Sequence, residues 1–341
     1  MPDSRNAHVA VQVTEPGARP EIAPVRPRTP ASGEVRIDVE ATGICGADAG
    51  TIADRTPGGG FPIIPGHEVA GVIAEVGPQV AGWQVGERVA VGWFGGSCGH
   101  CTACRTGDVV HCPDRQVPGL SYPGGWASTI TVPAAALARI PDGLTAVEAA
   151  PFGCAGVTVF NALRHGGARP GDRVAVAGIG GLGHLAVQFA AAMGYETIAI
   201  GRGEDKRQAA QDLGAHHYID ARAQDPGTAV RDLGGARLIV SAAASSSQLT
   251  SLIDGLTPHG RLTVAGFDTT AVQLPMVKLV MHARSLTGHL TGSPADTEQA
   301  MRFAVATGVR PLVQTLPLAE AERALQVQQA GDARFRMVLT P

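Results

Sequence analysis

A glycine-rich turn between a strand-like run and a helix-like run constrains the fold of this chain most. Arg173–Ala177 is a short valine-rich run, and Gly178–Gly183 follows it with the pattern Gly-x-Gly-x-x-Gly. In such a turn the first glycine bends the chain, the second lets the backbone approach a pyrophosphate, and the third lets the helix pack closely. The alternative is a bare glycine-rich turn in a glycine-rich chain. The predicted cofactor contacts in this turn are Gly178, Gly180, Gly181, Leu182 and Gly183.

Strand-like and helix-like segments alternate around this turn, from Pro170 to about Gly266. This alternation predicts a doubly wound parallel sheet with helices on both faces, the Rossmann architecture. The expected strands are Arg173–Ala177, Thr197–Ile200, Leu238–Ser241 and Leu262–Ala265, and the expected helices are Gly183–Met193 and Asp205–Leu213.

The first 150 residues carry a different pattern, with short alternating runs between Gly and Pro turns, which is typical of β structure. The expected strands there are Val9–Val13, Glu34–Val39, Val69–Val76 and Arg88–Val91, and a helix at Asp296–Ala306 and a strand at Met337–Leu339 close the chain. The fold class is therefore α/β. We predict a mostly-β catalytic domain over residues 1–153 and 290–341, and a Rossmann dinucleotide-binding domain over 154–289.

The length and net charge of the chain limit the classes of partner that we expect. A chain of 341 residues suits two domains. Its formal net charge of -3 offers no broad cationic field for nucleic acid, so a small-molecule substrate is expected. Met1–Asn6 lack the apolar stretch of an export signal, which favours the cytoplasm. Val174–Gly194 is apolar enough to resemble a membrane span, but its strand, glycine turn and helix pattern favour a buried segment and no membrane contact.

Four of the six cysteines cluster in one loop with the spacing Cys-x2-Cys-x2-Cys-x7-Cys. Four thiolates around one Zn²⁺ fill a closed tetrahedral shell, so this loop predicts a structural zinc site. An iron–sulfur cluster and four coincidental core cysteines are the alternatives. The four ligands of the predicted structural zinc are Cys98, Cys101, Cys104 and Cys112.

The other two cysteines, Cys45 and Cys154, are each compatible with an ordinary buried cysteine. Together with His67, in the segment Gly66-His67-Glu68, they make a Cys₂His set that leaves one position on zinc open. A satisfied structural histidine is the alternative for His67. An open position would permit catalysis at the metal.

These motifs, in this order, resemble the zinc-containing medium-chain alcohol dehydrogenase family. The resemblance covers essentially the whole chain and is greatest to its bacterial and cinnamyl-alcohol-dehydrogenase-like branch. The segments that carry it are Gly43-Ile44-Cys45, Gly66-His67-Glu68-x2-Gly71-x5-Gly77, the four-cysteine loop, Pro141-Asp142-Gly143-Leu144, Cys154-Ala155-Gly156-Val157-Thr158 and Arg334-Phe335-Arg336-Met337-Val338-Leu339.

The resemblance implies a GroES-like catalytic domain, two zinc ions per chain and a homodimer or homotetramer built through the cofactor domain near Leu286–Leu290. It implies catalytic zinc on Cys45, His67 and Cys154, with Glu68 as an occasional fourth ligand or close neighbour. It also implies that Asp48 orients a ligand histidine, that Thr158 contacts the nicotinamide and Arg336 the cofactor, and that Trp93 and Phe94 wall the substrate pocket.

The position that follows the second Rossmann strand indicates which cofactor is used. NAD sites of this type place an acidic residue there to hold the ribose, whereas this chain has Gly201 followed by Arg202. Arg202 can bind a 2'-phosphate, and Lys206 and Arg207 add positive charge, which favours NADP(H) over NAD(H). A solvated role for Arg202, and a ribose role for nearby Glu204, are the alternatives.

One departure from the family lies after Cys45, where many members carry a hydroxyl residue and a histidine that relay the alcohol proton. This chain has Ala47 and Gly50 there, and neither side chain carries a proton. Tyr122 and His289 are conceivable substitutes, although a structural role fits both better. The sequence favours an NADPH-dependent alcohol dehydrogenase or aldehyde reductase; the alternatives are a reductase of C=N or conjugated C=C bonds and a non-catalytic nicotinamide-binding protein.

Overall fold

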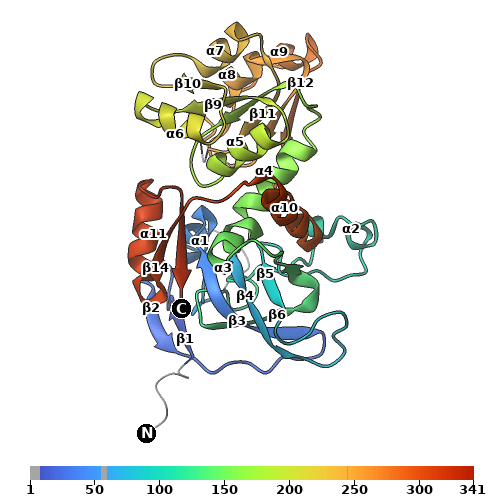
Figure 1. The fold of residues 1–341 in the computed structure, drawn as a ribbon, viewed down its shortest axis with the longest axis vertical. Helices are drawn as coiled ribbons and strands as arrows, with labels where there is room; N and C mark the ends of the chain where they lie inside the picture. Colours follow the sequence, from blue (N-terminus) through green and yellow to red (C-terminus); the bar gives the residue numbers. More distant parts are fainter. Residues whose placement is uncertain (1–7, 55–59, 244, 267) are drawn as a thin grey trace. The chain divides into compact units, whose positions relative to one another are not determined.

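The computed structural model describes residues 8–54, 60–243, 245–266 and 268–341, and the chain forms two compact units (Figure 1). Unit 1 comprises residues 1–154, 291–306 and 311–341, and unit 2 comprises residues 155–290 and 307–310. The chain thus leaves unit 1 directly after Cys154 and returns to it after Leu290.

Unit 2 is built on a six-stranded parallel sheet in the order β10-β9-β8-β11-β12-β13, so β10 and β13 are its edges. The doubly wound sheet predicted from the sequence is therefore present. Its strands are β8 (Arg173–Ala177), β9 (Glu196–Gly201), β10 (His217–Asp220), β11 (Ala236–Ser241), β12 (Leu256–Val264) and β13 (Ser285–Gly288). Its helices are α4 (Ala155–Arg164), α5 (Gly183–Ala192), η5 (Glu204–Lys206), α6 (Arg207–Asp212), α7 (Pro226–Asp232), α8 (Leu249–Asp254) and α9 (Val277–Val280).

Helices pack on both faces of this sheet, as the alternating side chains of β8 show. Ala175 and Ala177 of β8 belong to one buried cluster with side chains of α7 and α8. Because side chains alternate along a strand, Val174 and Val176 point to the opposite face. Gly183, the first residue of α5, lies against Val176 on that face.

The glycine turn forms the joint between β8 and α5, as its spacing predicts. A Cβ atom added to Gly183 would collide with the carbonyl oxygen of Gly178, so only glycine permits this close approach. At Gly180, by contrast, an added Cβ would meet no atom within 4 Å, and the residue is exposed. The turn is therefore packed at its helix end and open at its centre.

Unit 1 is mostly β structure. A seven-stranded sheet has the order β14-β15-β3-β4-β5-β7, with β6 paired to β3, and β1 and β2 form a separate pair. Its strands are β1 (Val9–Gln12), β2 (Glu21–Pro24), β3 (Glu34–Gly43), β4 (Val69–Val76), β5 (Arg88–Val91), β6 (Thr129–Pro133), β7 (Leu137–Arg139), β14 (Val313–Pro317) and β15 (Arg336–Thr340). Its helical segments are α1 (Gly46–Ile52), α2 (Thr102–Arg105), η2 (Val109–His111), η3 (Ala134–Ala136), α3 (Ala146–Ala149), η4 (Ala150–Gly153), α10 (Pro294–Thr307, all but its last residue), η6 (Leu318–Glu320) and α11 (Ala321–Ala330).

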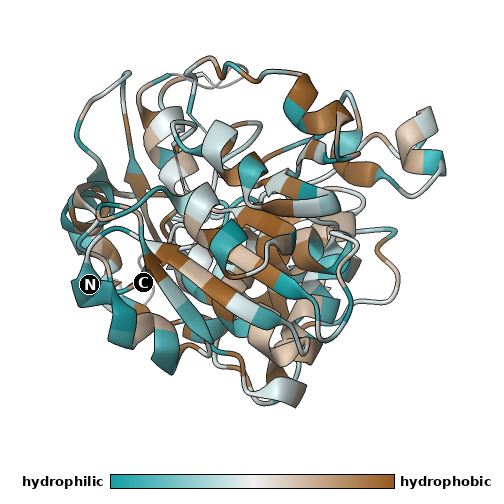
Figure 2. Ribbon diagram, turned by 90° about the horizontal axis from the view of Figure 1, so that it is seen from above, coloured by the Kyte–Doolittle hydropathy of each residue, from teal (hydrophilic) through white to brown (hydrophobic). Residues whose placement is uncertain are grey.

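Many strand residues are coloured hydrophobic in Figure 2, and exposed hydrophobic side chains also occur on and beside α9, at Val277, Val280 and Met281. Within the described residues, no single helix is both long and apolar enough to cross a membrane. Only the bent pair Ala146–Gly153 and Ala155–Arg164 passes such a test, on length and composition. The apolar stretch Val174–Gly194 is divided between β8, the glycine turn and α5.

Candidate metal centres and cofactor site

Three elements of unit 1 bring four potential metal ligands together. Cys45 precedes α1, His67 and Glu68 precede β4, and Cys154 follows η4. One ligand atom from each of these residues lies within 4.8 Å of the others. The Sγ atoms of Cys45 and Cys154 are 3.9 Å apart.

Asp48 holds this arrangement from within α1. One of its carboxylate oxygens accepts a hydrogen bond from the backbone N–H of Cys45 at 2.8 Å, and the other lies 2.9 Å from Nδ1 of His67. The first contact belongs to a capping box that fixes the start of the helix. The second directs the ring so that Nε2 is left for another partner. Asp48 therefore orients both Cys45 and His67, the role that the family resemblance implies for His67.

Neighbouring groups shift the pKa values of the two residues that Asp48 holds. Burial opposes protonation of His67, but the Asp48 carboxylate and nearby Cys45 raise the pKa of His67 well above its usual range. The Cys154 thiol, His67 and Arg336 lower the pKa of the Cys45 thiol despite burial. Cys45 is thus prepared to act as a thiolate.

Glu68 has a partner of its own. Nη2 of Arg336, on β15, donates to both carboxylate oxygens at 2.5 Å, and both side chains are buried, with relative exposures of 4% for Arg336 and 0% for Glu68. Burial raises the pKa of Glu68 to about 7, and the charge of Arg336 opposes this rise. The structure therefore assigns Arg336 a partner within unit 1, while its predicted contact with the cofactor stays a prediction.

The geometry of this first cluster fits a tetrahedral zinc ion. Zn–S bonds of about 2.3 Å in a tetrahedron place two sulfur atoms roughly 3.8 Å apart. The Sγ separation of 3.9 Å between Cys45 and Cys154 matches this value. Nε2 of His67 is buried without a hydrogen-bond partner among the described residues, which a metal bond would satisfy.

The four-cysteine loop also forms a compact cage. Its Sγ atoms are 3.6 Å apart for Cys98 and Cys112, 3.9 Å for Cys101 and Cys112, and 4.0 Å for Cys98 and Cys104. All four ligand atoms lie within 4.8 Å of one another. Backbone N–H groups of Cys98 and Cys104 point to the sulfur atoms of Cys112 and Cys101, as expected around thiolates. This donor set fits a closed tetrahedral metal site.

In unit 2, the glycine turn and Gly201, both predicted to contact the cofactor, lie at the carboxyl ends of β8 and β9. The glycine turn follows β8, and Gly201 is the last residue of β9. Thr158 lies on α4, where it is buried and its hydroxyl donates to the carbonyl oxygen of Leu290 at 3.3 Å. Ligands of open parallel sheets bind at this end of the strands.

Tyr218 explains why the acidic residue of NAD sites is missing at the end of β9. A Cβ atom placed on Gly201 would come within 2.6 Å of the Tyr218 hydroxyl and 3.0 Å of its ring. That hydroxyl donates to the carbonyl oxygen of Gly203 at 2.5 Å, so the ring is fixed there. The ring thus fills the space that a side chain at 201 would need.

The charged residues of the following turn differ in their partners. Both oxygens of Glu204 accept from Arg207, whose guanidinium also lies 5.0 Å from the centre of the Tyr218 ring. Glu204 is therefore engaged, which weakens its alternative role as a ribose ligand. Arg202 is exposed, and no described carboxylate forms an ion pair with it or with Lys206.

The remaining predicted residues occupy varied environments. The Tyr122 hydroxyl is committed to the carbonyl oxygen of Gly95 at 2.9 Å, and burial raises its pKa, so it is a poor proton relay. Ala47 and Gly50 both lie on α1, and His289 follows β13 in unit 2. Phe94 is buried. Trp93 is half-buried, with the Arg115 guanidinium 5.6 Å from its ring centre.

Comparisons with known proteins identify the family. Residues 31–142 match the alcohol dehydrogenase GroES-like domain, and residues 181–306 match the zinc-binding dehydrogenase domain. The chain is 41% identical to alcohol dehydrogenase notN of Aspergillus sp. (strain MF297-2), over 94% of this chain and 93% of that protein. It is 33% identical to NADP-dependent alcohol dehydrogenase C 1 of Mycolicibacterium smegmatis (strain ATCC 700084 / mc(2)155), over 98% and 97%.

A solved structure shows the same fold over the full length. The cinnamyl alcohol dehydrogenase SbCAD4 of Sorghum bicolor (L.) Moench superimposes with a TM-score of 0.90 at 29% identity, covering 98% of this chain and 97% of that one. The two-unit fold of this chain, a GroES-like β unit and a Rossmann unit, is thus that of the alcohol dehydrogenases it matches. The chain belongs to the zinc-containing medium-chain alcohol dehydrogenase family of nicotinamide-linked oxidoreductases.

Proposed function

We propose that this protein is a zinc-dependent alcohol dehydrogenase or aldehyde reductase that prefers NADP(H). The observation that carries the proposal is the buried set of Cys45, His67 and Cys154, in which Nε2 of His67 has no other partner among the described residues. Three protein ligands leave one tetrahedral position for a substrate oxygen. The four-cysteine cage would hold a second, structural zinc ion.

Each residue around the open site has a separate task. Bound zinc supplies Lewis acidity toward an alcohol or carbonyl oxygen, and the nicotinamide exchanges the hydride. Asp48 fixes the orientation of His67 and Cys45. Arg336 balances the charge of Glu68 beside the ligands. Trp93 and Phe94 would present an apolar wall, which suits aromatic or apolar substrates.

The preference for NADP(H) rests on the end of β9. Tyr218 excludes a side chain at Gly201, so the carboxylate that would repel a 2'-phosphate is absent from that position. Arg202 follows with an exposed guanidinium, which can bind phosphate through two parallel hydrogen bonds. The curated relative from Mycolicibacterium is named for the same cofactor.

Replacing Arg202 with alanine tests this preference. We expect about a 10-fold weaker Kd for NADPH and a change of less than about twofold for NADH, because only NADPH carries the 2'-phosphate. Fluorescence titration of both cofactors measures the two constants. Equal weakening for NADH and NADPH would contradict a 2'-phosphate role for Arg202.

The nature of the substrate is tested by an NADPH oxidation screen across aldehydes, cyclic imines and enones, with alcohols in the reverse direction. The absence of a relay side chain at Ala47 and Gly50 favours, as a second candidate, a reductase of C=N or conjugated C=C bonds. Strong aldehyde turnover without imine or enone activity excludes that candidate. The reverse pattern excludes an aldehyde reductase.

A non-catalytic nicotinamide-binding protein is the remaining alternative. Loss of catalysis would remove the need for an open metal site, whereas Cys45, His67 and Cys154 are all present. Metal analysis by mass spectrometry should give close to two zinc ions per chain, one of them removable by a chelator without unfolding. A protein with only the structural zinc would support the non-catalytic reading. We also propose a cytoplasmic location, because both clusters require reduced thiols.

We further propose that two copies associate through unit 2 at the β13 edge. Beside this edge, α9 and the residue after it present exposed apolar side chains, with relative exposures of 61% for Val277, 75% for Val280 and 70% for Met281. Val280→Glu should shift the protein from oligomer to monomer, because association would bury the new charge. Light scattering after size exclusion measures the mass. Val85→Glu, at another exposed apolar residue (64%), is the matched control and should leave it unchanged.

A further inference from the structure

A second basic residue lies beside the turn after β9, although it comes from a different strand. Asp220 ends β10 and is paired in register with Gly201. One of its carboxylate oxygens accepts hydrogen bonds from the backbone N–H groups of Gly203 at 2.8 Å and Arg222 at 2.9 Å. Asp220 thereby ties the turn after β9 to the turn after β10.

With the two turns connected in this way, the Arg222 side chain lies near the turn after β9. The position that a Cβ atom would take on Gly203 lies 3.5 Å from Nη1 of Arg222. Arg222 is exposed, and among the described residues no carboxylate forms an ion pair with it. Its guanidinium therefore lies beside the turn after β9, near Gly203, and Asp205 is the nearest carboxylate to that position.

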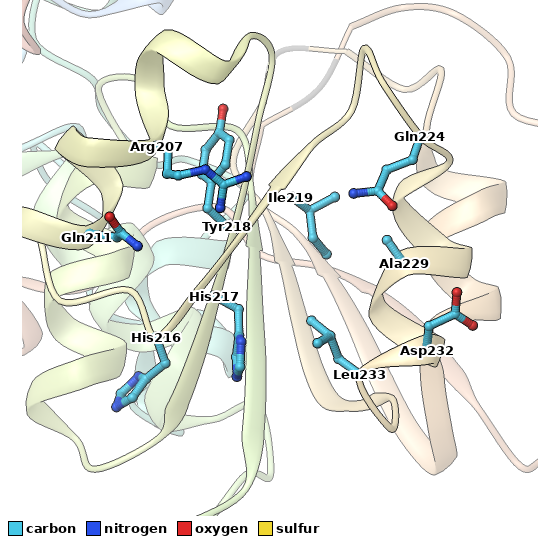
Figure 3. Close-up of a pocket in the computed structure, with 10 residues that line it drawn as sticks. All are labelled: Arg207, Gln211, His216, His217, Tyr218, Ile219, Gln224, Ala229, Asp232 and Leu233. Atoms are coloured by element: carbon cyan, nitrogen blue, oxygen red, sulfur yellow. The ribbon is translucent and has the colours of Figure 1, made fainter.

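Arg207, which the sequence suggests as a source of added positive charge, forms its contacts elsewhere. Figure 3 shows its side chain beside the Tyr218 ring, where it lines a hollow of about 350 Å³ along β10. Glu204 neutralises its charge. Arg207 thus serves to hold Tyr218 in the space next to Gly201, and a different cation is left to bind phosphate.

The acidic groups near the turn leave a net positive environment. Glu204 is paired with Arg207, and Asp220 is occupied by two backbone N–H groups, which lower its pKa. Asp205 is the one carboxylate in the turn without a described hydrogen bond or ion pair, and it lies near Gly203. Asp220 is nevertheless ionised, and Arg202, Lys206 and Arg222 together outnumber Asp205 and Asp220, so a phosphate dianion finds more positive than negative charge here.

We propose that Arg222 is a second ligand of the 2'-phosphate of NADP(H) and sets cofactor specificity together with Arg202. The inference rests on the proposed preference for NADP(H). The guanidinium fork matches the phosphate oxygens, and the hydrogen bond that Asp220 accepts comes from the Arg222 backbone, which leaves the guanidinium donors unused by it. The residue lies outside the glycine fingerprint and the segment that follows β9, so the sequence pattern does not point to it.

The test is calorimetric titration of the zinc-loaded protein with adenosine 2',5'-bisphosphate and with 5'-AMP. For Arg222→Ala we expect roughly 10-fold weaker binding of the bisphosphate and less than a twofold change for 5'-AMP, since only the former carries the 2'-phosphate. Arg222→Lys should retain part of the affinity. Arg231→Ala removes the same charge from the last turn of α7 and serves as the control, with both ligands unaffected.

The outcomes separate the inference from the proposed function. A wild-type protein that binds the bisphosphate no better than 5'-AMP contradicts the NADP(H) preference itself. A wild-type protein with a clear preference that Arg222→Ala leaves unchanged overturns the role of Arg222 alone. Equal losses for Arg222→Ala and Arg231→Ala would reduce the effect to overall charge and likewise overturn the assignment.

Discussion

Cys154→Ala is expected to lower kcat/KM by about 1000-fold or more and to reduce the zinc content from two ions to one per chain. The loss follows because metal Lewis acidity is worth several kcal/mol to the reaction and Cys154 is one of only three proposed ligands that leave a position open. Thermal unfolding should change little, since an open catalytic site contributes less to folding than a closed structural one. Steady-state kinetics and metal mass spectrometry on the same preparation measure both quantities.

The matched variant is Cys112→Ala in the four-cysteine loop. It should also lose one zinc ion, but with a clear fall in thermal stability, because its metal closes the loop that contains α2 and η2. Cys154→Ala should thus mainly lower activity, whereas Cys112→Ala should mainly lower thermal stability. Retention of two zinc ions and near-normal turnover by Cys154→Ala would show that this residue is an ordinary buried cysteine.

Arg336→Met should destabilise the protein by about 3–5 kcal/mol, because it leaves the buried Glu68 carboxylate without its partner. Urea unfolding of the cofactor-free protein, followed by tryptophan fluorescence, gives the free energy. Trp126 is fully buried in unit 1 and is suited to report on that unit.

The double variant Glu68→Gln/Arg336→Met provides the control. Removing both charges should restore much of the lost stability, so the two single effects should not add. Additive losses would mean that the two side chains do not interact in solution. The cycle also separates the ion pair from the volume change at Arg336, which is the same in both variants that carry methionine.

Local patterns were sufficient to predict much of the fold. The strands β4, β5 and β8 begin and end at the predicted residues, because short β-branched runs are bounded there by turn residues. The helix predicted at Asp205–Leu213 is instead divided between η5 and α6. Arg207, which joins the two segments, is drawn toward Glu204 and the Tyr218 ring. Such tertiary contacts determine helix boundaries that helix propensity alone does not specify.

The candidate sites show the same limit. Cysteine spacing and the His67 motif suffice to predict both metal clusters, because a tetrahedral metal site needs these ligand types and leaves a recognisable motif in the sequence. The pairing of Glu68 with Arg336 spans 268 positions, and no local pattern encodes it. Likewise, β10 itself was not predicted, and the contact of Tyr218 with Gly201 depends on the register between β9 and β10. These contacts depend on packing between distant segments and not on local motifs, so the sequence alone does not reveal them.

The position of Tyr218 constrains how this chain can evolve. An aspartate at Gly201, the simplest route to a ribose-binding acid, would meet the tyrosine ring and hydroxyl before it met any cofactor. A smaller residue at 218 alone would open the space but also release Gly203 and remove the surface on which Arg207 lies. Neither single substitution is therefore a productive intermediate. On the proposed preference for NADP(H), we therefore expect a change to NAD(H) to require substitutions at Gly201 and Tyr218 together.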